Sequence, residues 1–137
     1  MKLILPLLSV AFFSYAQPSI LGKWKTVDET GEEKSIIEIY ERDGRVYGKV
    51  IKIFTAEDPD PVCNECPEDD PRYRKKIIGM EIIKNMQKDD DTYSQGTILD
   101  PQDGKIYRCK LWIEEDGLKV RGYWGPFYRT QTWRRVR

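Results

Sequence analysis

The sequence predicts an all-β protein, a single eight-stranded antiparallel up-and-down β-barrel that follows a cleaved signal peptide. Apolar and polar residues alternate along most of the chain, which is the pattern of half-buried strands. Turn signals such as Asp-Gly separate these runs, mostly at intervals of about 8 to 12 residues, as in barrels and sandwiches. Closure into a barrel also removes the free sheet edges that would otherwise need protection.

Residues 1–16 differ from the rest of the chain and have the pattern of a signal peptide. Lys2 supplies a positive charge, the run from Leu3 to Phe13 is largely apolar, and Ser14 and Ala16 are small residues at the positions that a signal peptidase reads. The apolar run, at roughly 10 to 14 residues, is too short for a membrane-spanning helix. Cleavage after Ala16 leaves no transmembrane segment, so we expect a periplasmic or secreted protein.

The remaining residues, 17–137, are expected to form a single β-barrel domain. Removal of Lys2 from the 23 basic residues leaves 22 basic against 23 acidic residues. Nucleic-acid modules usually show a strong basic excess on one face, whereas here charged residues alternate with apolar ones along the strands. We therefore expect no nucleic-acid partner.

The first expected strand places Gly22, Trp24 and Thr26 on one face, so that Trp24 points inward. Turn signals at 28–31, 41–44, 88–91, 100–104, 114–117 and 125–126 separate the later runs. The third run is ambiguous, because its odd-numbered and even-numbered positions are both apolar. The expected strands are 19–26, 34–40, 45–54, 77–86, 92–99, 105–113, 118–123 and 128–136.

Residues 55–76 interrupt this alternation and are expected to form a long loop. They contain four of the eight prolines, seven acidic residues and two of the three cysteines. Loops of more than about 15 residues in a small domain are usually functional, lid-like or disordered. The acidic residues do not have the spacing of an EF-hand, so a solvated loop is favoured over a calcium site.

Cys63 and Cys66 are expected to form a disulfide within this loop, because an exported protein meets an oxidising compartment. A redox pair is disfavoured, since Pro67 and the surrounding acids do not lower a thiol pKa as a helix N-terminus does. Cys109 shares a face with apolar neighbours and is interpreted as a buried core thiol. Pairing of Cys109 with a loop cysteine, and a three-thiolate metal site, remain as alternatives.

The chain has no histidine, which excludes Ser-His and Cys-His nucleophile pairs and histidine-based zinc catalysis. Only carboxylates, tyrosines, lysines and thiols remain for chemistry, and they form no recognisable catalytic constellation. We therefore expect neither an enzyme, nor a cofactor, nor a metal site.

Nine short motifs, in order along the whole mature chain, resemble an exported bacterial family catalogued as domain of unknown function 2147. The resemblance implies a calycin-like (lipocalin-like) barrel in a Gram-negative envelope, with Trp24 on the first strand covered by Arg134 on the last. The shorter segment Gly125-Pro126-Phe127-Tyr128 departs from many relatives, which implies a change at one barrel mouth. The motifs are 22–24, 37–40, 47–50, 63–66, 78–82, 96–101, 104–107, 121–123 and 130–133.

An eight-stranded barrel encloses room for its own side chains or for one small ligand. We therefore predict a non-enzymatic binder of a small apolar or amphipathic molecule. The alternative is a structural or protein-interaction module that presents the long loop or the aromatics Tyr123, Trp124, Phe127 and Tyr128, with no protein partner identified. The candidate cavity-lining residues are Trp24, Ile37, Ile39, Glu81, Tyr107, Leu111 and Val120.

Overall fold

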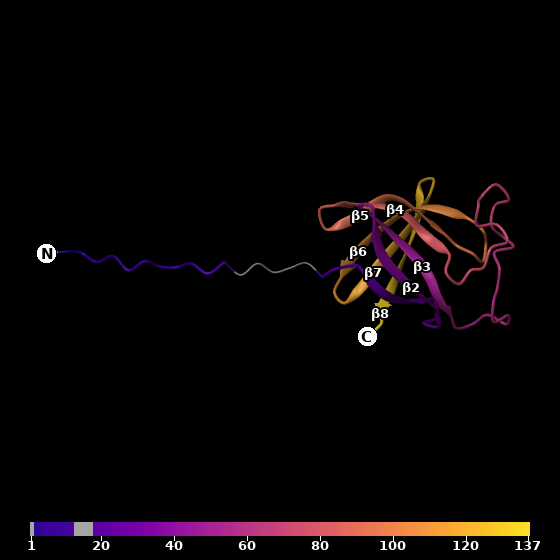
Figure 1. The fold of residues 1–137 in the computed structure, drawn as a ribbon, viewed down its shortest axis with the longest axis horizontal. Helices are drawn as coiled ribbons and strands as arrows, with labels where there is room; N and C mark the ends of the chain where they lie inside the picture. The colour runs from indigo at the N-terminus through magenta and orange to yellow at the C-terminus, as the bar shows by residue number, and fades with distance from the viewer. Residues whose placement is uncertain (1, 13–17) are drawn as a thin grey trace.

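The computed structural model describes residues 2–12 and 18–137, and the strands within this part form one closed antiparallel barrel (Figure 1). The strands are β1 Gly22–Val27, β2 Glu33–Arg42, β3 Arg45–Ile53, β4 Glu81–Asp89, β5 Thr92–Leu99, β6 Ile106–Glu114, β7 Gly117–Trp124 and β8 Phe127–Arg135. Each strand pairs with its neighbours in sequence, and β8 returns to pair with β1. The fold predicted from the alternation is confirmed.

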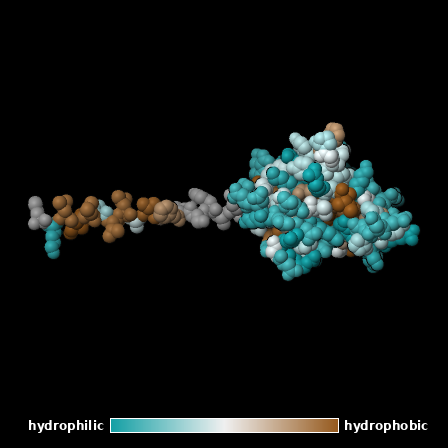
Figure 2. Space-filling view, turned by 90° about the horizontal axis from the view of Figure 1, so that it is seen from above, coloured by the Kyte–Doolittle hydropathy of each residue, from teal (hydrophilic) through white to brown (hydrophobic). Residues whose placement is uncertain are grey.

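Residues 2–12 lie outside the barrel, and all their side chains are exposed (Figure 2). In Figure 2 this segment is mostly brown, whereas the visible face of the barrel is mostly teal with small brown patches. The predicted cleavage site after Ala16 lies outside the described residues. No helix among the described residues is long and apolar enough to cross a membrane.

One end of the barrel is closed by its own side chains. Trp24 is 1% exposed, and its indole Nε1 donates to the Ile20 carbonyl at 2.8 Å. The Arg135 guanidinium lies 4.0 Å from the centroid of the Trp24 ring and donates to the Leu21 carbonyl at 2.9 Å. A cation over an indole face is attracted by the negative face of the ring.

The expectation that Arg134 covers Trp24 is therefore wrong by one residue. Successive side chains of a strand point to opposite faces, and Trp133 is buried at 2% exposure. Arg135 consequently shares the inner face with Trp133, whereas Arg134 points outward and is exposed.

The ambiguous third run is resolved by a bulge in β3. Ile37 pairs with Val50 and Ser35 pairs with Ile53, so one extra residue, Ile51, is accommodated between them. The extra residue changes the phase of the strand, and Val50 and Ile53 both reach the interior as a result. Tyr47 instead packs outside, where its ring lies 4.0 Å from the Arg42 guanidinium.

β4 begins at Glu81 rather than at Ile77 as expected from the isoleucine content. Gly79 has a φ of +92°, which L side chains rarely adopt, and the amide of Met80 donates to the Ile77 carbonyl at 3.0 Å. These two features make a turn of residues 77–80. The connection between β3 and β4 therefore covers 54–80 and is longer than the predicted loop.

Glycine permits a close contact between neighbouring strands at Gly96. A Cβ at this position would lie 2.2 Å from the Lys84 carbonyl oxygen and 2.4 Å from the Met86 sulfur. Met86 can therefore fill the barrel core, where it is fully buried beside Ile83 and Leu111. This packing fills the closed end and leaves the opposite end for a site.

Candidate functional site

A cavity of about 780 Å³ occupies the end of the barrel opposite Trp24. The β1–β2, β3–β4, β5–β6 and β7–β8 connections all lie at this end, because the strands run up and down in sequence. The interior lining comes from strands, whereas the rim and one side come from the β1–β2 and β5–β6 turns and the long loop. Representative lining residues are Thr26, Ile37, Val50, Pro61, Asp100 and Gln131.

The inner part of the cavity is apolar. Ile37, Val50 and Val120 line it and are each less than 5% exposed. Trp133 completes this floor, and its indole Nε1 donates to the Gln131 Oε1 at 3.1 Å. The Trp133 donor is therefore satisfied by a polar side chain that also lines the cavity.

A second set of lining groups is polar and lies nearer the mouth. The hydroxyls of Thr26 and Ser35 are 2.7 Å apart, and the hydroxyl of Tyr107 donates to Asp103 Oδ2 at 3.0 Å. Burial and the adjacent Asp103 carboxylate together raise the pKa of Tyr107. The cavity therefore combines an apolar floor with hydroxyl and amide groups, as small-molecule sites usually do.

Charged groups of both signs surround the mouth. Burial, followed by repulsion from Asp103, raises the pKa of Asp100. The Thr30 hydroxyl and nearby backbone amides lower the pKa of Asp28 to about 2. Arg129 Nη1 lies 3.3 Å from Glu29 Oε1, so it links β8 to the β1–β2 turn.

The predicted lining residues divide into those that line the cavity, those that are buried in the filled part of the barrel, and Glu81, which lies on the outer face. Ile37, Tyr107 and Val120 line the cavity. Trp24, Ile39 and Leu111 are buried in the filled part of the barrel and are not among the lining residues. These three residues lie nearer the closed end of the barrel. Alternation predicts that a side chain points inward, but it does not tell whether that side chain lines a cavity or packs in a filled core.

Glu81 does not line the cavity and its assignment there is wrong. Its carboxylate accepts hydrogen bonds from the Tyr40 hydroxyl and from Arg42 Nη1, the latter at 3.1 Å, on the outer face of the barrel. Burial raises the pKa of Glu81, but the Tyr40 and Arg42 hydrogen bonds outweigh it and the net shift is downward. Glu81 therefore connects β4 to β2 across β3.

Sequence reasoning missed the polar lining groups, notably Ser35, Gln131 and the 100–103 turn. Alternation from Trp133 places Gln131 on the inner face, so that signal was present. The contribution of Ile77 and Pro61 to the cavity wall could not be predicted from the sequence, because it depends on how the long loop folds.

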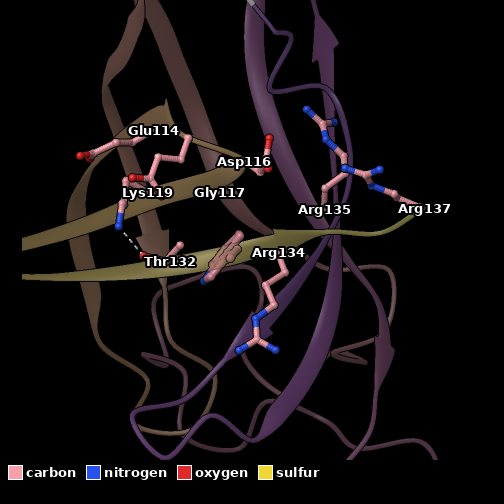
Figure 3. Close-up of a pocket in the computed structure, with 10 residues that line it drawn as sticks. Glu114, Asp116, Gly117, Lys119, Thr132, Arg134, Arg135 and Arg137 are labelled. Carbon is pink, nitrogen blue, oxygen red and sulfur yellow. Dashed lines mark hydrogen bonds between the residues drawn. The ribbon is translucent and has the colours of Figure 1, made fainter.

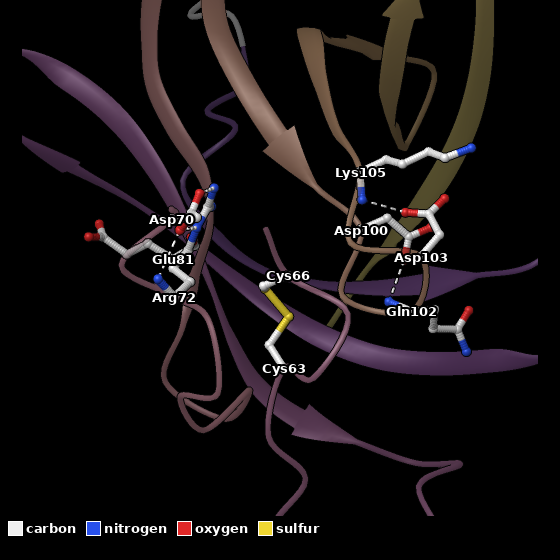
Figure 4. Close-up of a disulfide and its surroundings, with 9 residues drawn as sticks. All are labelled: Cys63, Cys66, Asp70, Arg72, Glu81, Asp100, Gln102, Asp103 and Lys105. Atoms are coloured by element: carbon white, nitrogen blue, oxygen red, sulfur yellow. Dashed lines mark hydrogen bonds and ion pairs between the residues drawn. A yellow bond between two sulfur atoms is a disulfide. The ribbon is translucent and has the colours of Figure 1, made fainter. Parts of the chain in front are cut away.

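The long loop lies beside the open end and is held there by several contacts (Figure 4). Cys63 and Cys66 form a disulfide, as predicted, and Cys63 is fully buried. A Cβ on Gly104 would lie 1.6 Å from the Glu65 carbonyl oxygen, so only glycine lets the β5–β6 turn approach the disulfide segment this closely. The loop therefore forms a fixed part of the cavity wall.

Asp70 and Arg72 attach the same loop to β4. Arg72 Nη2 lies 2.8 Å from Asp70 Oδ2, and Arg72 Nη1 donates to the Glu81 carbonyl at 2.9 Å. Both side chains are largely buried, and the Arg72 hydrogen bond is the main cause that lowers the pKa of Asp70 to about 2.

Cys109 is a free, buried thiol in the barrel interior, and burial raises its pKa to about 12.

A second hollow, of about 440 Å³, lies at the outer surface near the β6–β7 turn (Figure 3). It is lined by residues of opposite charge, including Glu114, Asp116, Arg134 and Arg137. Figure 3 shows the hydrogen bond from Lys119 Nζ to Thr132 Oγ1, at 2.7 Å, along one side. It lacks the enclosed apolar floor of the mouth cavity, which is therefore the stronger candidate site.

Comparisons with known proteins agree with this architecture. Residues 22–135 match the model of a family described as "Uncharacterized protein conserved in bacteria (DUF2147)". A similar solved structure is described as "Protein HP1028 from the human pathogen Helicobacter pylori belongs to the lipocalin family", with a TM-score of 0.74 and 21% sequence identity. The match covers 88% of this chain and 85% of that one. No curated protein sequence matches.

Proposed function

Because the chain belongs to the uncharacterised bacterial family DUF2147 and folds as a lipocalin-like barrel, we propose that it binds a small apolar or amphipathic molecule in the mouth cavity. The cavity of about 780 Å³ is the observation that carries this proposal, since it lies in the usual range of small-molecule sites. Its apolar floor suits a hydrocarbon or ring system. Its hydroxyl and amide groups suit a polar end nearer the mouth.

The proposed activity is binding rather than catalysis. The chain has no histidine, and Cys109, whose pKa burial raises to about 12, is a poor nucleophile near neutral pH. The mouth carboxylates Asp100 and Asp103 lie on one turn and cap backbone amides, and Asp28 likewise accepts from the amides of Thr30 and Glu32. These observations support a binding protein that leaves its ligand unchanged.

We also propose that the protein is exported, to the periplasm or beyond the cell. The apolar residues 2–12 support this, because they contribute no side chain to the barrel core. Cell fractionation tests the proposal. Recovery of a full-length chain in the cytoplasm, still carrying residues 1–16, would contradict it.

The experiment that tests binding is native mass spectrometry of the protein purified without denaturant, followed by organic extraction. A reproducible additional mass would identify a ligand. The matched variants are Val120→Phe, which projects into the cavity, and Lys119→Phe, its outward-facing neighbour on β7. We expect Val120→Phe alone to lose the bound mass or to weaken binding at least tenfold.

Thermal unfolding of both variants shows whether each still folds, because overpacking a core costs about 1–3 kcal/mol. An apoprotein mass that persists after exposure to mixed lipids and small metabolites would overturn the proposal. Equal binding by the two folded variants would place the ligand outside the cavity.

A further inference from the structure

The outer face of β6, β7 and β8 combines cations and aromatic rings in adjacent rows. Paired residues on neighbouring antiparallel strands project from the same face of a sheet. Arg108 pairs with Tyr123, which pairs with Tyr128, and the next rows join Lys110 to Arg121 and Trp112 to Lys119. We call this face the basic aromatic strip; it comprises Arg108, Lys110, Trp112, Lys119, Arg121 and Tyr128.

The four cations of the strip have no acidic partner. Within 18–137, no carboxylate lies within 4.0 Å of the charged nitrogens of Arg108, Lys110, Lys119 or Arg121. The same outer face of β6 carries one carboxylate, Glu114, which accepts from Trp112 Nε1 at 3.3 Å, so the four cations leave a local excess of positive charge in a chain with 23 basic and 23 acidic residues. An anionic partner would compensate that excess.

Local contacts hold these cations in defined positions. The Arg121 guanidinium lies 4.2 Å from the Tyr128 ring centroid and 4.9 Å from that of Trp112, and its Nε donates to Thr130 Oγ1 at 2.8 Å. Lys110 Nζ lies 5.9 Å from the Trp112 ring. Side chains that are already ordered lose less conformational freedom when they bind.

The ring faces are covered by these cations, and this decides between two kinds of polyanion. Sequence-tolerant binding of single-stranded nucleic acid relies on open aromatic faces on which bases stack. Arg121 covers one face of the Trp112 ring and one face of the Tyr128 ring, so these faces support the cation rather than offer stacking platforms. Charge pairing with phosphate groups on a surface remains available.

Exposed aromatic residues extend the strip toward the open end. Tyr128 is 58% exposed and packs beside its outer-face partner Tyr123, whereas Trp124 and Phe127, which pair with each other, lie on the inner face at the rim of the mouth. Trp and Tyr favour the boundary between lipid headgroups and hydrocarbon, and Lys and Arg are attracted to anionic headgroups. The acidic turns at 28–32 and 100–104 flank the mouth itself, which favours contact through the side of the β7–β8 hairpin.

We propose that the basic aromatic strip docks the barrel onto a membrane surface rich in anionic phospholipid. Guanidinium and ammonium groups of the strip contact lipid phosphates, while Tyr128 enters the headgroup layer. Docking would hold the cavity mouth close to the bilayer. The proposal goes beyond ligand binding, and it stands or fails independently of it because the strip faces away from the cavity.

The test is sedimentation with vesicles of phosphatidylcholine alone and of phosphatidylcholine with 30% phosphatidylglycerol. The protein begins at Gln17, because the exposed apolar residues 2–12 would bind any vesicle and contribute nothing to the barrel core. We expect binding only to the anionic vesicles, and we expect it to weaken as salt is raised from 0.05 to 0.5 M.

The informative variant is Arg108→Glu with Lys110→Glu, and its matched control is Arg45→Glu with Lys88→Glu. The control pair lies outside the strip, is exposed, and changes the net charge equally. Each removed cation is worth about fivefold in affinity for an anionic surface. We expect the strip variant to lose more than 25-fold, with the control changed by less than threefold and cavity binding unchanged in both.

Three results would overturn the docking proposal. The first is equal sedimentation with the two kinds of vesicle, and the second is an equal loss in the two charge-reversal variants. The third is tighter binding of single-stranded oligothymidylate than of anionic vesicles, which would assign the strip to nucleic acid instead. Loss of vesicle binding with retained cavity ligand would leave the proposed function intact.

Discussion

At the scale of single residues, the closed end depends on one arginine near the C-terminus. Arg135 covers the ring of Trp24 and donates to the Leu21 carbonyl, and the Trp24 indole in turn donates to the Ile20 carbonyl. These contacts connect the last strand to the segment before the first. They are important because β1 and β8 share only two paired positions, Trp24 with Arg135 and Lys25 with Arg134.

We therefore predict that Arg135→Ala lowers the free energy of unfolding by about 1–3 kcal/mol, from the lost cation–π contact and the charged hydrogen bonds. The matched control, Arg134→Ala, should change it by less than about 0.5 kcal/mol, because that side chain is exposed and outward-facing. Urea denaturation followed by tryptophan fluorescence measures both. Equal losses in the two variants would show that Arg134 contributes to closure as well.

At the scale of elements, alternation was sufficient to predict every strand, but not where an irregular segment joins one. The isoleucines at 77 and 78 suggested an earlier start of β4, whereas the positive φ of Gly79 ends the irregular segment just before Glu81. The path of residues 54–80 depends on contacts between distant residues, such as that of Glu65 with Gly104. Local pattern carries no information about such contacts, so the loop side of the cavity could not be predicted.

The attachment of this loop to β4 should depend on pH. The folded-state pKa of Asp70 is about 2, below the ordinary value of 3.8, because Arg72 stabilises the carboxylate. A carboxyl pKa that is lower in the folded state than in the unfolded state stabilises the folded protein at pH values above the unfolded-state pKa. This stabilisation is lost as the pH falls from about 4 toward 2. The shift corresponds to about 2 kcal/mol at neutral pH.

We predict that Asp70→Asn is destabilised by about 2 kcal/mol at pH 7 and that the difference from wild type becomes small near pH 2. Denaturant titrations at several pH values measure this. Asp69→Asn is the control, since Asp69 is an exposed neighbour in the same loop. A difference that stays constant between pH 7 and pH 2 would show that the Asn side chain disturbs the loop for reasons other than charge.

At the scale of the whole molecule, closure of the sheet protects the barrel interior from solvent. The reactivity of Cys109 indicates whether the barrel is open. Cys109 is 3% exposed and is not part of the Cys63–Cys66 disulfide. It lies on β6 opposite Gly96 of β5, in the filled half of the barrel. Burial raises its pKa to about 12, so neither access nor ionisation favours reaction in the folded state.

We therefore predict that Cys109 reacts with a thiol reagent such as iodoacetamide only when the barrel opens as a whole. Its labelling rate at increasing urea should give the same free energy as global unfolding, because opening of β5 from β6 breaks the closed sheet. A ligand in the mouth cavity should slow labelling in proportion to its concentration above Kd, since it binds only the folded state. Rapid labelling in native buffer would reveal a local opening between β5 and β6. A labelling rate that does not change when ligand is bound would mean that Cys109 becomes accessible without release of the ligand from the mouth cavity.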